Sequence, residues 1–200
     1  METVAVRPAV IEDSPALRSV LARAFSNDPC MSWIFPDDAT RVAKLEVLFT
    51  MALDRVFLPL GAAYTTEDLG GCALWAPPAQ WRIPDAVSEE MAPVMAEAFG
   101  PDDLGRLLTF FGLSEEHHPP EDHWYLGVLA ADLERQGRGI GSACMRPVLE
   151  RADLDHTPAY LESSNEKNVP LYERHGFQVT KVVDLPDSGP PLFLMWRDAR

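Results

Sequence analysis

Gln136-Gly137-Arg138-Gly139-Ile140-Gly141 is the stretch that decides the fold, because of what stands on either side of it. It follows an apolar run over 124–130 and precedes a helical pattern that begins at Ser142. Glycine has no Cβ, so backbone N–H groups in such a turn can point toward one spot, and the first helical turn adds unpaired donors. The stretch therefore predicts a phosphate-binding loop between a strand and a helix, with a ligand-free glycine turn as the alternative.

Two familiar phosphate-binding loops fit this stretch poorly. A P-loop requires a lysine after its last glycine, and a dinucleotide fingerprint that starts at Gly137 requires glycine where Ser142 stands. Glu162, about 20 residues further on, does match the ribose-binding carboxylate of a dinucleotide fold. Only 38 residues follow it, too few for further βαβ units of about 30 residues each. The dinucleotide fold remains a weaker alternative.

A third pattern resembles the GNAT superfamily of N-acetyltransferases. The two signatures of that superfamily are matched by Gln136, Gly139 and Gly141 and, about 30 residues later, by Asn168, Tyr172, Gly176 and Phe177. The resemblance implies one α/β domain over residues 1–200, with a mixed, mostly antiparallel central sheet flanked by helices. It also implies that two strands of this sheet splay apart at the acetyl-CoA site.

Acetyl-CoA is the cosubstrate that the resemblance implies, and no metal is implied. Its pantetheine arm is expected between the splayed strands and its pyrophosphate on the glycine loop. The residues that the resemblance assigns to acetyl-CoA are Val128, Leu129, Ala130, Gln136, Gly137, Arg138, Gly139, Ile140, Gly141, Ser142, Asn168 and Tyr172.

Acetyl transfer to an amine needs one group that takes the amine proton and one that protonates the leaving thiolate. Tyr172 is the expected acid, because a phenol can hydrogen-bond sulfur and release its proton as charge builds there. Glu162 is the expected base or the anchor of a cationic amine, with Tyr160 on the same face of its strand. The structural alternatives are a packed ring for Tyr172, a solvent-exposed acid for Glu162 and a helix N-cap for Asn168.

Length and composition predict a single enzyme domain. The chain has 200 residues, 46% hydrophobic and 24% charged, which is ordinary for a folded domain. No basic leader and no apolar run of about 18 residues is present, so we expect a cytoplasmic protein without a membrane partner. Cys30, Cys72 and Cys144 predict small buried side chains, whereas His117 and His118 predict a solvated loop without a metal site.

The net charge of −14, from 17 basic and 31 acidic side chains, argues against a nucleic-acid partner. It favours cationic small molecules through long-range attraction, and it serves solubility equally well. A loop that binds the polyanionic CoA must nevertheless be locally positive. Arg135 and Arg138, beside the glycines, are expected to supply that charge.

Strand and helix patterns alternate along the chain without an internal repeat. We expect strands over 3–7, 62–66, 72–76, 123–130, 158–162, 177–184 and 192–196, and helices from 14, over 37–57, 86–99 and 102–111, and after the glycines and 168. An aromatic turn is expected over 31–36, and a helical insertion at about 77–120 is expected to cover the substrate side. The side chains expected to line the acceptor pocket are Trp33, Phe35, Trp75 and Trp81.

These observations predict an acetyl-CoA-dependent N-acetyltransferase that acetylates the amine of a small molecule by direct attack in a ternary complex. Residues 120–200 are similar to acetyltransferases of aminonucleoside antibiotics, which implies an aminonucleoside or another amine-bearing antibiotic as acceptor, and a role in antibiotic resistance. The alternatives are acetylation of a peptide or protein amine and a non-catalytic acetyl-CoA-binding regulatory module. We expect a monomer or a homodimer.

Overall fold

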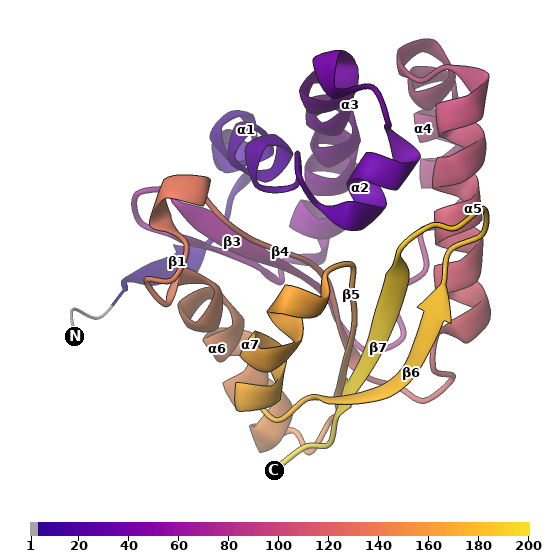
Figure 1. The fold of residues 1–200 in the computed structure, drawn as a ribbon. Helices are drawn as coiled ribbons and strands as arrows, with labels where there is room; N and C mark the ends of the chain where they lie inside the picture. Colours follow the sequence, from indigo (N-terminus) through magenta and orange to yellow (C-terminus); the bar gives the residue numbers. More distant parts are fainter. Residues whose placement is uncertain (1–3) are drawn as a thin grey trace.

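The computed structural model describes residues 4–200 as a seven-stranded sheet with helices on both faces (Figure 1). The strand order is β1-β2-β3-β4-β5-β7-β6, and every neighbouring pair is antiparallel except β4 and β5. This sheet confirms the expected fold class and excludes a dinucleotide fold, whose sheet is mostly parallel. The strands are β1 (Val6–Pro8), β2 (Ala63–Thr66), β3 (Gly71–Ala76), β4 (Trp124–Ala131), β5 (Ala159–Ser163), β6 (Gln178–Asp184) and β7 (Pro191–Arg197).

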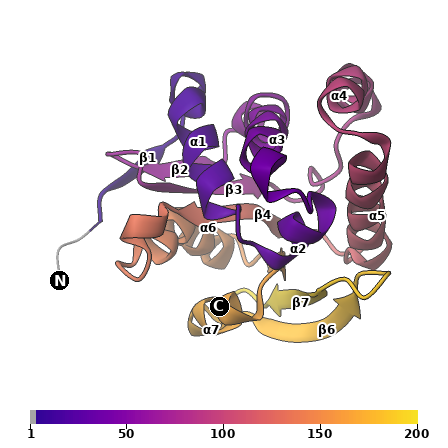
Figure 2. The ribbon, with the colours of Figure 1, turned by 45° about the horizontal axis from the view of Figure 1, so that its top comes forward.

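The helices form two layers, one on each face of the sheet. Figure 2 shows α1, α2 and α3 on one face and α6 and α7 on the opposite face, while α4 and α5 stand beside α2 and α3. The helices are α1 (Ser14–Ala24), α2 (Pro29–Ile34), α3 (Asp38–Met51), α4 (Asp85–Ala98), α5 (Pro101–His117), α6 (Ile140–Leu154) and α7 (Val169–Arg174).

Each face of the sheet carries its own hydrophobic core, and β3 lies between the two. All six residues of β3 are buried. Cys72 and Leu74 belong to the core of the α1–α3 face, whereas Ala73 and Trp75 belong to the core of the α6–α7 face. Helices on both faces therefore explain why the strand is continuously apolar instead of alternating.

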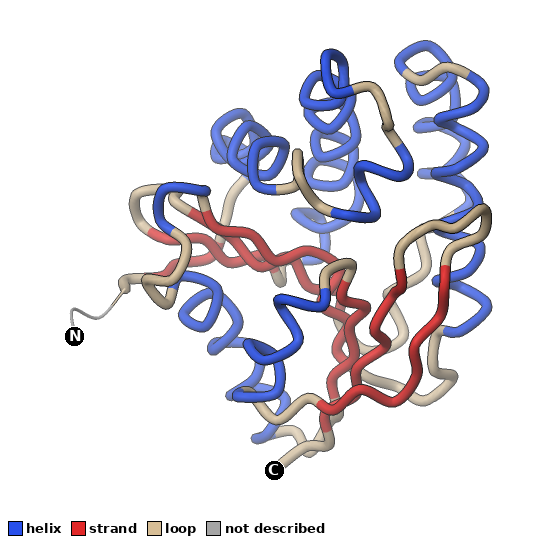
Figure 3. Tube along the Cα trace, in the orientation of Figure 1, coloured by secondary structure: helices blue, strands red, loops and turns tan. Residues whose placement is uncertain are grey.

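β4 and β5 pair over only three residues before they separate. The paired residues run from Trp124 and Ala159 to Leu126 and Leu161, and beyond them β4 continues along β3 and β5 along β7. Figure 3 shows the result, since strands β1 to β4 run in a different direction from β5 to β7. The splayed strands that the resemblance implied are present.

A β-bulge marks the point of separation. Between two successive pairs with β3, β4 contains one extra residue, Gly127, and such a bulge bends and twists its strand. A Cβ on Gly127 would overlap the tip of the Phe57 ring. Glycine is therefore required where the Phe57 ring packs against the bulge.

Several elements differ from the expectations. The segment expected as an aromatic turn over 31–36 is largely helix α2, and α5 continues beyond Phe111 to His117 because Leu113 still packs against the core. The helix expected over 37–57 changes from α to π geometry at Ala52. The first expected strand begins at Thr3, which lies outside the described residues.

The three cysteines are fully buried free thiols, which confirms their expected role as small core residues. Burial raises the pKa of the Cys144 thiol to about 12. Within residues 4–200, no helix combines the length and the apolar composition needed to cross a membrane.

Candidate active site

The glycine loop connects β4 to α6 and exposes a row of unpaired backbone donors. Gly137 and Gly139 have φ angles of +75° and +82°, and Gly139 is the N-cap of α6. Among the described residues, no acceptor takes the N–H groups of residues 136–142. These groups, together with the positive end of the α6 dipole, fit a pyrophosphate. The predicted loop therefore has the conformation that its glycines suggested.

Gly139→Val is expected to raise the Kd of acetyl-CoA by about 10- to 100-fold, because a non-glycine residue at such a positive φ costs about 1–3 kcal/mol and a β-branched one is the least tolerated. Valine forces the loop out of the geometry in which its N–H groups are free. Isothermal titration with acetyl-CoA measures the effect.

Gly139→Asn is the matched control, since asparagine adopts the left-handed conformation more readily than other side chains. It is expected to bind acetyl-CoA more tightly than the valine variant. Normal affinity in the valine variant would show that the loop does not hold the cosubstrate.

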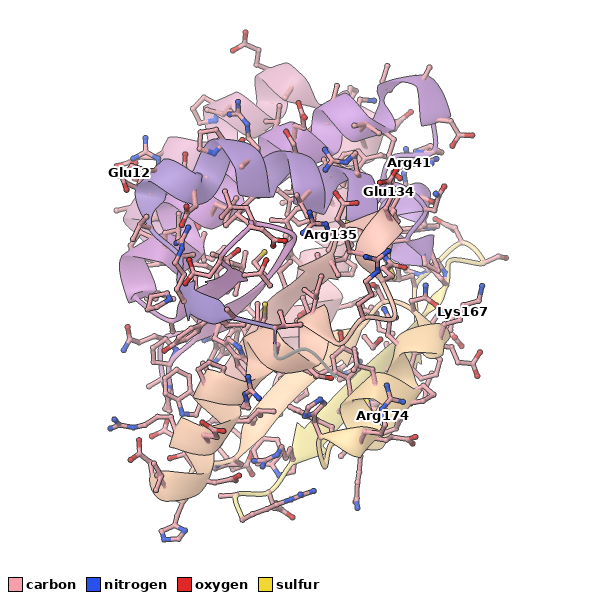
Figure 4. All side chains as sticks on the ribbon, turned by 90° about the vertical axis from the view of Figure 1, so that its left-hand side faces the viewer. Glu12, Arg41, Glu134, Arg135, Lys167 and Arg174 are labelled. Atoms are coloured by element: carbon pink, nitrogen blue, oxygen red, sulfur yellow. The ribbon has the colours of Figure 1, made fainter. Side chains whose placement is uncertain are left out.

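Of the two arginines expected to supply positive charge at the loop, only Arg138 lacks an acidic partner among the described residues. Arg135 forms an ion pair with Asp68, so its charge is already compensated. Arg138 is exposed and has no carboxylate partner among the described residues. Lys167 and Arg174 are equally unpaired there and lie on the same face of the molecule as Arg135 (Figure 4). Arg138, Lys167 and Arg174 are therefore unpaired basic side chains available to an anionic ligand.

Val128, Leu129 and Ala130 lie in the part of β4 that has left β5. They pair with Leu74, Ala73 and Cys72 of β3. Only the edge of β4 that faces β3 is therefore paired in this region. The opposite edge keeps backbone N–H and C=O groups that no neighbouring strand satisfies. This unpaired edge is suited to a pantetheine arm, which carries amide groups of its own.

Tyr172 lies in α7, 7% exposed, on the α6–α7 side of the sheet. Its ring packs edge-on against Phe177 with the centroids 6.2 Å apart. Among the described residues its hydroxyl makes no hydrogen bond. Burial, followed by the nearby charge of Asp28, raises the pKa of this phenol. Tyr172 is therefore a neutral donor that retains its proton until a stronger base draws it away.

Asp28 is a residue of this region that the sequence analysis missed. Its carboxylate is 7% exposed and accepts the N–H groups of Cys30 and Met31, at 3.0 and 3.1 Å, and the Ser164 hydroxyl at 2.5 Å. Burial raises its pKa. The sequence did carry a signal, because Asp28 followed by proline is a typical helix start.

Asn168 stands at the N-cap position of α7, but its side chain accepts no capping hydrogen bond. The preceding 3-10 turn, η5 (Glu166–Asn168), is capped by Asn165 instead, which accepts the Lys167 N–H at 3.1 Å. The helix-capping alternative for Asn168 is therefore wrong. Its exposed amide is free to reach a ligand.

Glu162 lies in β5 with its side chain only 6% exposed, so the alternative of a solvated strand-end acid is wrong. Oε1 accepts hydrogen bonds from the hydroxyls of Ser114 at 2.7 Å and Tyr160 at 3.1 Å, and Oε2 accepts one from Tyr125 at 2.8 Å. The predicted shared face of Glu162 and Tyr160 is confirmed. Burial and then the Glu162 charge raise the pKa of Tyr160, which keeps this hydroxyl a donor.

His118 corrects a further expectation, because it is not part of a solvated loop. Its side chain is 1% exposed and stacks on Trp81 with the ring centroids 3.6 Å apart, and its Nδ1 lies 3.7 Å from Glu162 Oε1. We call Glu162, Ser114, His118, Tyr125 and Tyr160 the Glu162 cluster. Helix α5 and its C-cap contribute two of its members, Ser114 and His118.

Of the four aromatic residues expected to line the acceptor pocket, Trp33, Phe35 and Trp81 belong to the core of the α1–α3 face, whereas Trp75 belongs to the core of the opposite face. Trp81 reaches the Glu162 cluster through His118. Phe35 and Trp75 are fully buried in the two separate cores. Trp33 lies partly buried near Gly189, where a Cβ on the glycine would lie 2.9 Å from the indole nitrogen.

The two expected proton-transfer groups approach the separated strands from opposite faces of the sheet. Tyr172 belongs to the core of the α6–α7 face, and Tyr160, hydrogen-bonded to Glu162, belongs to the core of the α1–α3 face. Such an arrangement allows an acid and a base to act on two sides of one reacting group. Within residues 4–200, no group of three or more His, Cys, Asp or Glu side chains is placed to hold a metal ion.

The chain matches the model of the Acetyltransferase (GNAT) family over residues 64–177. This range covers more than half of the 200 residues and includes the glycine loop, Glu162 and Tyr172. The protein therefore belongs to the GNAT family of acetyltransferases.

Known relatives agree with this assignment. An uncharacterised N-acetyltransferase of Schizosaccharomyces pombe is 33% identical over 81 residues, 39% of this chain and 33% of the yeast protein, so the matched region spans a third of that relative. The structure named histone acetyltransferase HPA2 and related acetyltransferase, from Corynebacterium glutamicum, has a TM-score of 0.74 and 26% identity over 100% of this chain and 98% of its own. The polyamine N-acetyltransferase of Drosophila melanogaster, with a TM-score of 0.64 and 15% identity over 98% and 99%, shares the fold.

Proposed function

We propose that the protein is an acetyl-CoA-dependent N-acetyltransferase that acetylates the amine of a small molecule by direct attack in a ternary complex. One observation supports this proposal: β4 and β5 pair over three residues and then separate, Glu162 directly follows the last paired residue of β5, and the separated part of β4 leads into a loop of unpaired N–H groups. Acetyl transfer can use such N–H groups for the cosubstrate and a buried carboxylate for the amine, with Tyr172 as the proposed acid.

The residues that fit acetyl-CoA are those of the loop and of β4 beyond the bulge. Residues 136–142 offer N–H groups to the pyrophosphate, and Arg138 adds charge. Residues 128–130 offer the unpaired strand edge to the pantetheine arm, with Asn168 near the loop side. When bound, acetyl-CoA supplies a thioester carbonyl as the acceptor of nucleophilic attack and a thiolate as the leaving group.

The remaining roles belong to side chains and backbone of this chain. Glu162 attracts a cationic amine and accepts its proton, which frees the nitrogen lone pair. N–H groups on the unpaired edge of β4 stabilise negative charge that develops nearby, an effect worth roughly 3 kcal/mol in a site without water. Tyr172 gives its hydroxyl proton to the departing sulfur.

A small acceptor fits the Glu162 cluster better than a protein chain does. The Glu162 side chain is 6% exposed and accepts a hydrogen bond from Ser114 of α5, so only a small group can approach the carboxylate. We also propose that residues 77–120 form an insertion that covers the acceptor side of the site. The similarity to puromycin N-acetyltransferase over residues 120–200 makes an aminonucleoside antibiotic the first acceptor to test.

A protein amine is the second candidate acceptor. The Corynebacterium glutamicum neighbour is named a histone acetyltransferase and shares 26% of its residues with this chain. The Drosophila melanogaster neighbour is described as forming N-acetylagmatine, which keeps small cationic amines among the candidates. The net charge of −14 suits both kinds of basic acceptor.

An amine panel tests the proposal. Release of CoA is measured with puromycin, agmatine and a lysine-rich histone-tail peptide as acceptors. Turnover of puromycin would support the antibiotic acceptor, and turnover of the peptide alone would overturn the small-amine proposal. Binding of acetyl-CoA without turnover of any amine would favour the regulatory module instead.

The proposal also covers the location, the oligomeric state and the partners of the protein. We infer a single N-acetyltransferase domain that acts in the cytoplasm as a monomer or homodimer, without a nucleic-acid or membrane partner. The acidic composition supports the nucleic-acid part of this inference, because nucleic acids repel a net charge of −14. Light scattering and a DNA-binding titration at low salt would check the oligomeric state and the absence of binding.

A further inference from the structure

A row of polar contacts runs from Glu162 away from the separated strands. Glu162 Oε1 lies 3.7 Å from His118 Nδ1, His118 Nε2 lies 2.9 Å from His123 Nε2, and His123 Nδ1 lies 2.6 Å from the carbonyl oxygen of Glu121. Both imidazole rings are 1% exposed. Water therefore has little access to either ring, and the contacts themselves determine where the protons sit.

The carbonyl of Glu121 fixes the tautomer of both histidines. A carbonyl oxygen only accepts, so His123 Nδ1 carries a hydrogen. Burial lowers the pKa of His123, so this ring is neutral and its Nε2 is a bare acceptor. His118 Nε2 must then donate to His123 Nε2. A neutral His118 consequently presents a bare Nδ1, a proton acceptor, toward Glu162.

The Glu162 carboxylate already has hydrogen-bond donors on both of its oxygens. Ser114 and Tyr160 donate to Oε1, and Tyr125 donates to Oε2. His118 Nδ1, 3.7 Å from Oε1, is a bare nitrogen beside this carboxylate. A proton that the carboxylate accepts therefore has a second acceptor within reach.

We propose that His118 Nδ1 takes up the proton that Glu162 accepts from the substrate ammonium, and that His123 is the positioning residue that keeps His118 in the required tautomer. The inference rests on the proposed acetyl transfer. An N–H bond of the ammonium breaks and leaves its electron pair on nitrogen, and the proton passes through Glu162 to His118. The resulting imidazolium pairs with the Glu162 carboxylate and, once the product has left, returns its proton through Glu162 to water. The second amine proton leaves nitrogen as the amide forms and returns to the Tyr172 oxygen, which has given its own proton to the thiolate.

The groups that face His118 all belong to this arrangement. Glu162 and Tyr160 approach from β5, Tyr125 from β4 and His123 from the segment before β4, while Trp81 stacks on the ring without charge. Glu162 is the only one of these that bears a negative charge at neutral pH. It therefore stabilises the imidazolium that the proposal requires.

His118→Gln tests the proposal by kinetics. We expect kcat to fall by about 10- to 100-fold and the acidic limb of the kcat–pH profile to move toward lower pH, since a carboxylate would replace an imidazole as the final proton acceptor. The proton acceptor must be unprotonated to act, so a weaker base keeps the enzyme active down to a lower pH. His117→Gln is the matched control, because the one hydrogen bond that its side chain makes among the described residues is with Lys181 on the exposed surface, and it should leave both quantities unchanged. If the His118 variant keeps both the kcat and the acidic limb of the kcat–pH profile of the wild-type protein, the proposal is overturned.

The histidine tautomers provide a readout that does not depend on turnover. Nitrogen chemical shifts of the 5 histidines, assigned by substitution, should show His118 protonated at Nε2 and His123 at Nδ1 in the wild-type protein. His123→Phe removes the acceptor and should release this preference and lower kcat, whereas His123→Gln offers an amide oxygen and should restore both. A wild-type His118 protonated at Nδ1 would overturn the inference. Failure of the proposed function would appear separately, as correct tautomers without turnover of any amine.

Discussion

Glu162→Gln is expected to lower kcat by about 10²- to 10⁴-fold, the range over which a positioned acid or base accelerates a reaction. Glutamine keeps the shape of the side chain and one accepting oxygen, which can serve either the Ser114 and Tyr160 hydroxyls or the Tyr125 hydroxyl, but it takes up no proton at neutral pH. Steady-state kcat and KM with the best amine of the panel measure the effect, and the thermal midpoint of unfolding reports whether the fold is intact.

Glu166→Gln is the control for this variant. Glu166 lies four residues further along the chain, is exposed, and has no side-chain partner among the described residues. Its substitution removes the same charge without touching the Glu162 cluster. A Glu162 variant with the kcat of this control would show that the buried carboxylate takes no part in proton transfer.

Tyr172→Phe is expected to lower kcat by about 10²-fold or more, because the leaving thiolate loses its proton donor. The Kd of acetyl-CoA and the free energy of unfolding should change little. The Tyr172 hydroxyl has no partner among the described residues, so its removal leaves no buried group unsatisfied. Single-turnover kinetics and acetyl-CoA titration separate the chemical step from binding.

Tyr64→Phe provides the comparison for this second variant. Tyr64 lies in β2 and packs against the same α6–α7 core, away from the separated strands. Loss of its hydroxyl should leave kcat unchanged. If the Tyr172 variant also acetylates every amine at the normal rate, the acid is another group, and a non-catalytic role for Tyr172 follows.

Most helices and strands were predicted correctly from local sequence patterns. The hairpin over 62–76, the core strands and the helix after the glycines were correct because apolar spacing and turn residues act within a few positions of each other. Helix α2 was missed because its aromatic residues hid the capping signal of Asp28. The end of α5 was placed too early because its last turns are held by packing against the core rather than by sequence pattern.

The site was predicted less completely, for reasons of distance along the chain. Tyr160 and Glu162 were placed on one face because strand alternation is local. No local rule relates His118 or Ser114 to Glu162, since more than 40 residues separate them. Arg135 was expected to face the cosubstrate, yet the hairpin brings Asp68 to it. Asn168 was compatible with capping in sequence, and only the structure shows that its side chain accepts no capping hydrogen bond.

The sequence by itself determined the family, the sheet class and the glycine loop. Positive φ angles require glycine, and a strand, a loop and a helix must follow one another in order, so these features are written in neighbouring residues. The tertiary structure alone decided which side chains meet at the separated strands. The burial of Glu162, its hydroxyl donors, the histidine row behind it and the charge of Asp28 near Tyr172 depend on how helices from distant segments pack on the sheet. Packing, and not local pattern, therefore sets the protonation chemistry of this site.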